Sequence, residues 1–195
     1  MLDSNKTGSE PPINHPKKTW KQFGWDRGAD YKKTYSKLTV LLKEYAEKEG
    51  IHADSGFAFS CVLLTQLRNG SRVSEAVDAM NGWLKNRNPS VEVRVRKQKT
   101  ASTRLMVIPP EVQRYYSYKS RVLGALASAQ LPAIEMWSRR RLGYNTHSLR
   151  YAWITEAARR GISPQLIAKI TGHRTLDMVL SYTQKSGAED ILQKF

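Results

Sequence analysis

Apolar residues recur every three to four positions through most of this chain, which is the period of amphipathic helices. The first such stripe consists of Leu38, Leu41, Leu42 and Tyr45. A later run is apolar on nearly every side, which is typical of a helix buried in a core. The pattern predicts helices over Tyr31–Glu49, Phe57–Leu67, a segment beginning at Ser71 or Arg72, Glu111 to about Ala129, and Pro132–Arg141.

One part of the chain has the two-residue period of a β-strand instead. Val91, Val93 and Val95 alternate with charged residues, and a second short run covers Arg104–Ile108 before a Pro-Pro pair stops it. Two such runs separated by a polar loop predict a β-hairpin. The fold class is therefore expected to be mainly α with one small hairpin or sheet, an α+β protein.

The last third of the chain, Thr146 to Thr183, predicts three short helices with clear start and stop signals. The signals are of the usual kinds, namely capping side chains, a first-turn proline and terminal glycines. Asn145 or Thr146 can cap the first helix, Ser163 before a proline starts the second, Thr175 can cap the third, and Gly161 and Gly172 end the first two.

The first of these helices is expected to place His147 and Arg150 on one face, because residues three apart are neighbours on a helix surface. That face suits a phosphate, since it carries two cationic or hydrogen-bonding groups. The core side of the same helix is expected to consist of Leu149, Trp153, Ile154 and Ala157.

The composition of the chain indicates the kind of partner that it binds. The chain has 195 residues, enough for one good core, and its hydrophobic content of 40% is ordinary for a globular protein. Its net charge of +15 is not ordinary. A basic excess of this size indicates a polyanionic partner, with nucleic acid the first candidate and an anionic membrane surface the second. Without a bilayer-length apolar run or a signal-peptide pattern, the expected location is intracellular.

The sequence carries few signatures of metal, nucleotide or thiol chemistry. The four histidines form no HExxH pattern, and neither a phosphate-binding GxxxxGK[ST] loop nor a GxSxG elbow is present. The single cysteine, Cys61, lies in an apolar run and is expected to be a buried structural thiol. Arg, Lys, His and Tyr remain, and these can transfer a phosphoryl group with no metal and no cofactor.

Several short motifs share one order and spacing. His147 and Arg150 lie in HSLR, His173 follows in TGH, and Tyr182 comes nine residues after His173. Upstream, Arg72 lies in GSRVSE at the start of a helix. Over residues 31 to 190 this arrangement resembles the catalytic domain of the tyrosine recombinase (phage integrase) family. The family also has a catalytic lysine in a hairpin loop, for which RKQKTAST offers Lys99, with Lys97 as the alternative.

The resemblance implies a role for each residue. Tyr182 would attack the scissile phosphate and form a 3′-phosphotyrosine with a free 5′-hydroxyl. Arg72 and Arg150 would clamp the non-bridging oxygens, for which the planar guanidinium is well matched. A 5′-hydroxyl from another strand would then attack the phosphotyrosine, so neither ATP nor metal is required.

The remaining implied roles concern protons and hydrogen bonds. His173 would donate to the phosphate, and His147 would orient the site and act on the proton of the nucleophile. Lys99 would protonate the leaving 5′-oxygen.

Other basic residues are expected to contact the DNA backbone, which gives salt-dependent affinity without sequence information. These are Arg94, Arg96, Lys97, Arg139, Arg140 and Arg141. Lys17, Lys18 and Lys21, with Trp20 and Trp25, are either a further DNA contact or a solvated tail.

The expected domain organisation is a polar linker or N-terminal arm over 1–30 and a catalytic domain over 31–195, without the N-terminal core-binding domain that the family commonly carries. The tail 184–195 has an apolar side of Ile191, Leu192 and Phe195 that docks either on a neighbouring subunit or on its own domain. The resemblance implies double-stranded DNA as partner, a tetramer in synapsis and a monomer when free.

Two other functions remain open at this point. A type IB topoisomerase or hairpin-telomere resolvase would use the same catalytic residues but rejoin DNA differently. A non-catalytic regulator would use Ser163 to Tyr182 as a helix-turn-helix. The favoured hypothesis is a site-specific recombinase or integrase, acting in the cytoplasm of a prokaryotic host and encoded there or by a virus or plasmid.

Overall fold

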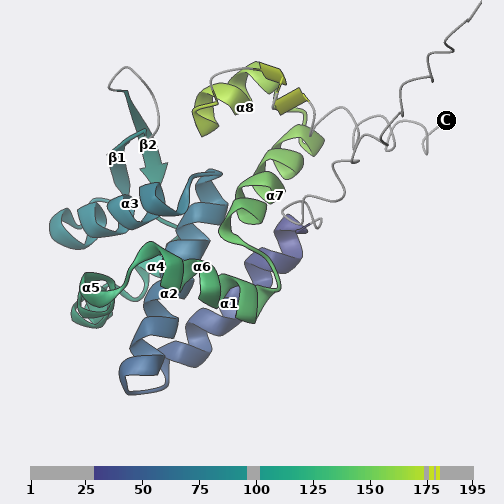
Figure 1. Cartoon of the computed structure of the whole chain (residues 1–195). Helices are drawn as coiled ribbons and strands as arrows, with labels where there is room; N and C mark the ends of the chain where they lie inside the picture. The colour runs from purple at the N-terminus through teal and green to yellow at the C-terminus, as the bar shows by residue number, and fades with distance from the viewer. Residues whose placement is uncertain (1–28, 96–101, 174–175, 178, 181–195) are drawn as a thin grey trace, which may run out of the picture.

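The computed structural model describes residues 29–95, 102–173, 176–177 and 179–180 (Figure 1). The predictions for the N-terminal arm, for the hairpin loop from Arg96 to 101 and for the tail lie outside the described residues. Within them the protein is mainly helical with one two-stranded antiparallel sheet, so the predicted class is confirmed.

The elements follow the chain in a simple order. They are α1 (Tyr31–Ala46), α2 (Ile51–Asn69), α3 (Val73–Asn86), β1 (Ser90–Arg94), β2 (Thr103–Val107), α4 (Pro110–Gln113), the 3₁₀ turn η2 (Tyr116–Tyr118), α5 (Lys119–Ser128), α6 (Leu131–Leu142), α7 (Thr146–Arg159) and α8 (Pro164–Thr171).

Helix α2 is the centre of the fold. It is buried along most of its length, and α1, α3, α5 and α7 all pack against it (Figure 1). The predicted helix Phe57–Leu67 is confirmed, but α2 begins earlier, at Ile51, which is exposed and contributes nothing to a core pattern. Gly56 sits inside the helix because Tyr45 packs there: a Cβ at this position would lie 2.5 Å from Tyr45 Cε1.

The predicted hairpin and its two-residue period are confirmed. Val93 and Met106 are buried on the face that meets the helices, and the intervening residues are exposed. Val91 pairs with Met106, and Ser90 pairs with Val107 at the base of the hairpin.

The single helix predicted from Glu111 to about Ala129 is wrong, because α4, η2 and α5 divide the segment. Aromatic residues have modest helix propensity, and here three tyrosines lie within four positions. Tyr115 and Tyr118 contact the ring of Phe57 with centroid distances of 5.5 and 5.6 Å, and Tyr116 contacts Trp83 of α3 at 5.3 Å. The segment makes these ring contacts in place of the continuous backbone hydrogen bonds of a single α-helix.

The end of α1 also differs from its prediction, since the helix stops at Ala46 and not at Glu49. The guanidinium of Arg121 on α5 binds the chain at this point. It donates to the carbonyls of Tyr45, Ala46 and Lys48 at 2.8–3.2 Å and to Asp54 Oδ1 at 2.6 Å. The last carbonyls of α1 therefore find a cationic donor from a distant helix.

Helix α7 joins two groups of buried apolar residues among those described. The larger group, called the main core, gathers around α2 and includes Leu149 and Ala152 of α7. The smaller group, called the minor core, consists of Tyr151, Ile154, Ala157, Ile167, Ala168 and Val179. Leu149, Ile154 and Ala157 are buried as predicted, whereas Trp153 is half-buried.

The caps predicted for the last third are confirmed where the structure describes them. Asn145 accepts from the backbone N–H of Ser148, and Ser163 caps α8. Gly172 ends α8 in the left-handed conformation. Of the predicted third helix, residues 176, 177, 179 and 180 are helical. In the described parts of the chain, all of the helices are too short or too polar to cross a membrane.

Gly70, at the end of α2, offers a stability test with an internal control. Its φ is +56°, and a Cβ there would lie 2.5 Å from Trp153 Cε3. Gly143 has φ +86° but open space around it. We expect Gly143→Ala to lower the free energy of unfolding by about 1 kcal/mol through backbone strain, and Gly70→Ala to lower it by about 1–3 kcal/mol more through overpacking. Urea unfolding followed by circular dichroism measures both, and equal losses would contradict the role given to Trp153.

Candidate active site

The turn between α2 and α3 is bound by side chains from three other parts of the fold. Its three consecutive carbonyls, of Asn69, Gly70 and Ser71, accept hydrogen bonds from Arg104 Nη2 at 2.6 Å, Arg150 Nη1 at 3.1 Å and Gln66 Nε2 at 3.2 Å, respectively. Gln66 also donates to the carbonyl of Thr146 at 2.8 Å, which links this turn to the start of α7. The turn therefore fixes the residues that follow it, beginning with Arg72.

Arg72 is held at the start of α3 by Glu75. Arg72 Nη1 donates to Glu75 Oε1 at 2.8 Å, and the backbone N–H of Arg72 donates to Glu75 Oε2 at 3.2 Å. The Glu75 carboxylate is fully buried, and Arg104 Nη1 lies 3.5 Å from its other oxygen, Oε2. One buried carboxylate thus contacts two arginines from different elements.

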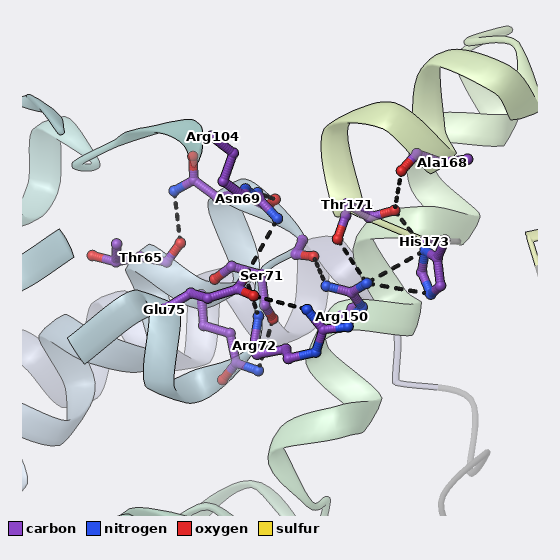
Figure 2. Close-up of polar contacts among 12 residues, drawn as sticks. Thr65, Asn69, Ser71, Arg72, Glu75, Arg104, Arg150, Ala168, Thr171 and His173 are labelled. Carbon is purple, nitrogen blue, oxygen red and sulfur yellow. Dashed lines mark hydrogen bonds and ion pairs between the residues drawn. The ribbon is translucent and has the colours of Figure 1, made fainter. Parts of the chain in front are cut away.

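Arg150 of α7 extends from the main core towards the end of α8. It is 3% exposed, and its Nη2 donates to the carbonyl of Thr171 at 2.8 Å while Nη1 binds the α2–α3 turn (Figure 2). Burial, together with the charge of Arg72, lowers the pKa of Arg150 to about 10. The guanidinium therefore remains charged at neutral pH.

His173 follows α8 directly and faces Arg150. Its Nδ1 is 2.6 Å from the hydroxyl of Thr171, which itself donates to the carbonyl of Ile167 at 2.6 Å. Since that hydroxyl proton is already used, we assign the proton of the imidazole to Nδ1, and Nε2 is left as an acceptor. Arg150 Nη2 lies 3.4 and 3.3 Å from Nδ1 and Nε2.

The environment of His173 disfavours its charged form. Burial and then the charges of Arg150, Arg72 and His147 lower the pKa of His173 to about 4. The imidazole is therefore neutral at pH 7 as long as nothing offsets those charges.

The electrostatic balance of this cluster favours an anion. Arg72 and Arg104 contact the carboxylate of Glu75, which also acts electrostatically on Arg150, and burial lowers the pKa of Arg104. Buried guanidinium groups are stabilised when an anion accepts their hydrogen bonds. A phosphate oxygen supplies such an acceptor, and the arginines come from the cap of α3, from β2 and from α7.

His147 lies near the cluster, at the surface. Its side chain is exposed and lines a hollow of about 410 Å³ together with Arg139 and Tyr151. The ring of His147 contacts that of Tyr151 edge-on, with centroids 5.8 Å apart. Its charge contributes to the lowered pKa of His173, so the two histidines share one electrostatic environment.

The predicted DNA contacts within the described residues are all exposed. Arg94 lies on β1, and Arg139, Arg140 and Arg141 lie at the end of α6. The three arginines of α6 line two different hollows. Arg139 lines the one beside His147, and Arg140 and Arg141 line a second hollow of about 680 Å³ beside Tyr45. Their role in DNA binding stays a prediction.

The structure thus brings together Arg72, Arg150 and His173, and it places His147 beside them. Arg96, Lys97, Lys99 and Tyr182 lie outside the described residues. The residues that support this cluster were not predicted from the sequence; they are Gln66, Asn69, Glu75, Arg104 and Thr171. Glu75 could have been identified from the sequence, because it lies three residues after Arg72, the spacing of a reciprocal helix cap. Thr171 could have been identified because it directly precedes the Gly-His pair.

The chain is similar in sequence to proteins of two viruses and an archaeon. No family model matches the chain, and no solved structure matches it significantly. The protein "Putative integrase ORF241" of Acidianus two-tailed virus is 34% identical over 171 residues, which are 87% of this chain and 68% of the viral protein. "Uncharacterized protein MJ0770" of Methanocaldococcus jannaschii is 30% identical over 197 residues, 87% of each chain.

A third relative also bears an integrase name. "Putative integrase V10" of Sputnik virophage is 28% identical over 206 residues, which cover 88% of this chain and 90% of the virophage protein. Because the first similarity combines 34% identity with more than two thirds of the relative's length, this chain belongs to the same family as the integrase-named protein of Acidianus two-tailed virus.

Proposed function

We propose that this protein is a tyrosine recombinase that cuts and rejoins double-stranded DNA at specific sites through a 3′-phosphotyrosine intermediate. The observation that carries the proposal is the cluster in which Arg72 and His173, both half-buried, and the buried Arg150 converge from three segments of the chain. The integrase names of two viral relatives support the same class of reaction and DNA as the substrate.

In the proposed first step, the hydroxyl of Tyr182 attacks the scissile phosphorus, and His147 takes up its proton. A bond forms between the tyrosine oxygen and phosphorus, and the bond from phosphorus to the 5′-oxygen breaks. Lys99, or Lys97 in its place, gives the departing 5′-oxygen a proton. Attack by another 5′-hydroxyl on the phosphotyrosine reverses these changes, so no external energy source is needed.

Arg72 and Arg150 stabilise the charge on the phosphate during both steps. Fixed donors aimed at a developing charge give large rate effects because they need no reorganisation as the reaction proceeds. Both guanidinium groups are held in place before any phosphate binds. Glu75 accepts from Arg72, and two backbone carbonyls accept from Arg150. We also expect the active form to be a homo-oligomer on DNA, a tetramer in synapsis.

The covalent intermediate provides the direct test. Wild-type protein incubated with a nicked suicide duplex is expected to form a protein–DNA adduct visible on a denaturing gel, with or without EDTA. Tyr182→Phe is expected to abolish it while retaining DNA binding. DNA binding by the wild type without any adduct would contradict the proposal and favour a non-catalytic DNA-binding protein.

The phosphate clamp can be tested against an exposed arginine. Arg72→Ala is expected to slow single-turnover cleavage by about 10²–10³-fold at saturating DNA, the size of effect seen when one fixed donor is lost. Arg94→Ala, on the outer face of β1, is the matched control: it should weaken binding in a salt-dependent manner and leave the saturated rate unchanged. Equal rate losses in the two variants would argue against a clamp at Arg72.

The lowered pKa of His173 predicts a pH dependence of binding. In the free protein this pKa is about 4. A phosphate in the cluster adds negative charge and raises the pKa, so the DNA complex binds more protons than the free protein. Affinity for a short duplex should therefore rise as pH falls from 7.5 to 5. His173→Gln should show a shallower rise in fluorescence anisotropy titrations, and identical slopes would contradict a phosphate at His173.

A further inference from the structure

Asn69, the last residue of α2, binds the hairpin as a neighbouring strand would. Its side-chain Nδ2 donates to the carbonyl of Val107 at 2.8 Å, and its Oδ1 accepts from the backbone N–H of Val107 at 2.9 Å. A pair of bonds to both backbone groups of one residue is what an adjacent β-strand provides. Asn69 is 9% exposed, so these bonds are shielded from water.

These bonds lie on the edge of β2 that faces away from β1. Strand β1 pairs with β2 along its other edge, from Ser90–Val107 to Arg94–Thr103. The side chain of Asn69 is also bound to its own helix, because its Nδ2 donates to the carbonyl of Thr65 one turn earlier in α2. The amide group is therefore fixed to the central helix and to the hairpin together.

A second connection joins β2 to the same turn. Arg104, three residues before Val107, donates from Nη2 to the carbonyl of Asn69 at 2.6 Å, and its Nη1 lies 3.5 Å from the Glu75 carboxylate that holds Arg72 (Figure 2). The side chain of Arg104 is only 7% exposed. The hairpin is thus tied at two points to the residues that position the phosphate clamp.

We propose that Asn69 is a positioning residue for protonation of the leaving group. This inference rests on the proposed function, in which a lysine between β1 and β2 donates the proton. That loop joins the end of β1 to the start of β2, so the position of the hairpin relative to Arg72 sets where the two ends of the loop are anchored. Asn69 fixes the base of the hairpin at Val107, and its side chain is shielded from solvent.

The size of the expected effect follows from geometry. Catalytic groups displaced by about 1 Å can lose about 10²-fold in rate. A displaced hairpin would act on the step that breaks the bond to the 5′-oxygen, because that oxygen needs a proton as it leaves. The clamp arginines would still be held by Glu75 and by the carbonyls of Gly70 and Thr171.

A sulfur-substituted substrate separates this role from a general loss of structure. In a suicide duplex whose bridging 5′-oxygen is replaced by sulfur, the leaving group is a thiolate. Thiols ionise near neutral pH, with a pKa of about 8.5 in cysteine, so the thiolate can leave without a proton donor. A variant that is defective in protonation should therefore cleave the sulfur duplex at a rate close to that of wild type, whereas a variant that is defective in the phosphate clamp should remain slow.

The experiment compares single-turnover cleavage of the oxygen and sulfur duplexes at saturating DNA. Asn69→Leu, which is similar in size and lacks both hydrogen-bonding groups, is expected to cleave the oxygen duplex about 10–100-fold more slowly than wild type. On the sulfur duplex its rate should lie within about threefold of wild type. Lys99→Ala and Lys97→Ala provide the reference for a variant that lacks the donor, and Arg72→Ala should be slow on both duplexes.

Each other result overturns the inference. Equal losses of Asn69→Leu on both duplexes would show that Asn69 does not act through the leaving group. If wild type forms the adduct but sulfur rescues neither lysine variant, the hairpin does not supply the proton: the inference then fails while the proposed function stands. Absence of an adduct from wild type on both duplexes would overturn the proposed function itself.

A second variant covers the case in which Asn69→Leu does not fold. Asn69→Asp keeps an acceptor for the N–H of Val107 and loses the donor to its carbonyl. It should show the same selective loss on the oxygen duplex, and thermal unfolding monitors its fold. A folded Asn69→Asp with wild-type rates on the oxygen duplex would contradict the role of this hydrogen-bond pair.

Discussion

The buried guanidinium of Arg150 is the interaction on which the site depends. Moving a charge out of water is costly, and the cost is tolerable only when hydrogen bonds and opposite charges replace the lost hydration. Arg150 obtains two backbone carbonyls, one from the α2–α3 turn and one from the end of α8. Those carbonyls belong to segments about 100 residues apart, so satisfying this one side chain brings the parts of the site together.

The same chemistry explains why the cluster is suited to a phosphate. Carbonyl oxygens are neutral, and Glu75 shares its charge between Arg72 and Arg104, so the arginines retain an excess of positive charge. The neutral His173 belongs to the same balance, since its low pKa reflects burial and the nearby cations. An anion that enters the cluster therefore meets donors that are already oriented, which is the condition for strong electrostatic stabilisation.

The elements that could be predicted from the sequence are those whose boundaries or periodicity are encoded by neighbouring residues. The cap at Asn145, the Ser163-Pro164 start and the left-handed Gly172 are all encoded within a few residues, and the alternation of Val91, Val93 and Val95 encodes the hairpin.

The unpredicted features depend on distant partners. The break between α4 and α5 comes from tyrosines that contact Phe57 and Trp83, and no pattern within the segment reveals those partners. The candidate site residues predicted from sequence are those with a chemical signature in their spacing. Asn69 and Arg104 have ordinary surroundings in the sequence, and their importance appears only when β2 lies beside the end of α2.

The minor core has a consequence for the dynamics of the site. Helix α8 packs mainly on α7 through a handful of apolar residues, and it carries both the carbonyl of Thr171 and His173. A fluctuation that moves α8 away from α7 removes the carbonyl of Thr171 and the ring of His173 from Arg150 at once, so that the buried charge keeps the carbonyl of Gly70. Conversely, a ligand that holds Arg150 and His173 opposes that opening. The local unfolding equilibrium of this eight-residue helix is therefore thermodynamically linked to the binding of any ligand that contacts Arg150 and His173.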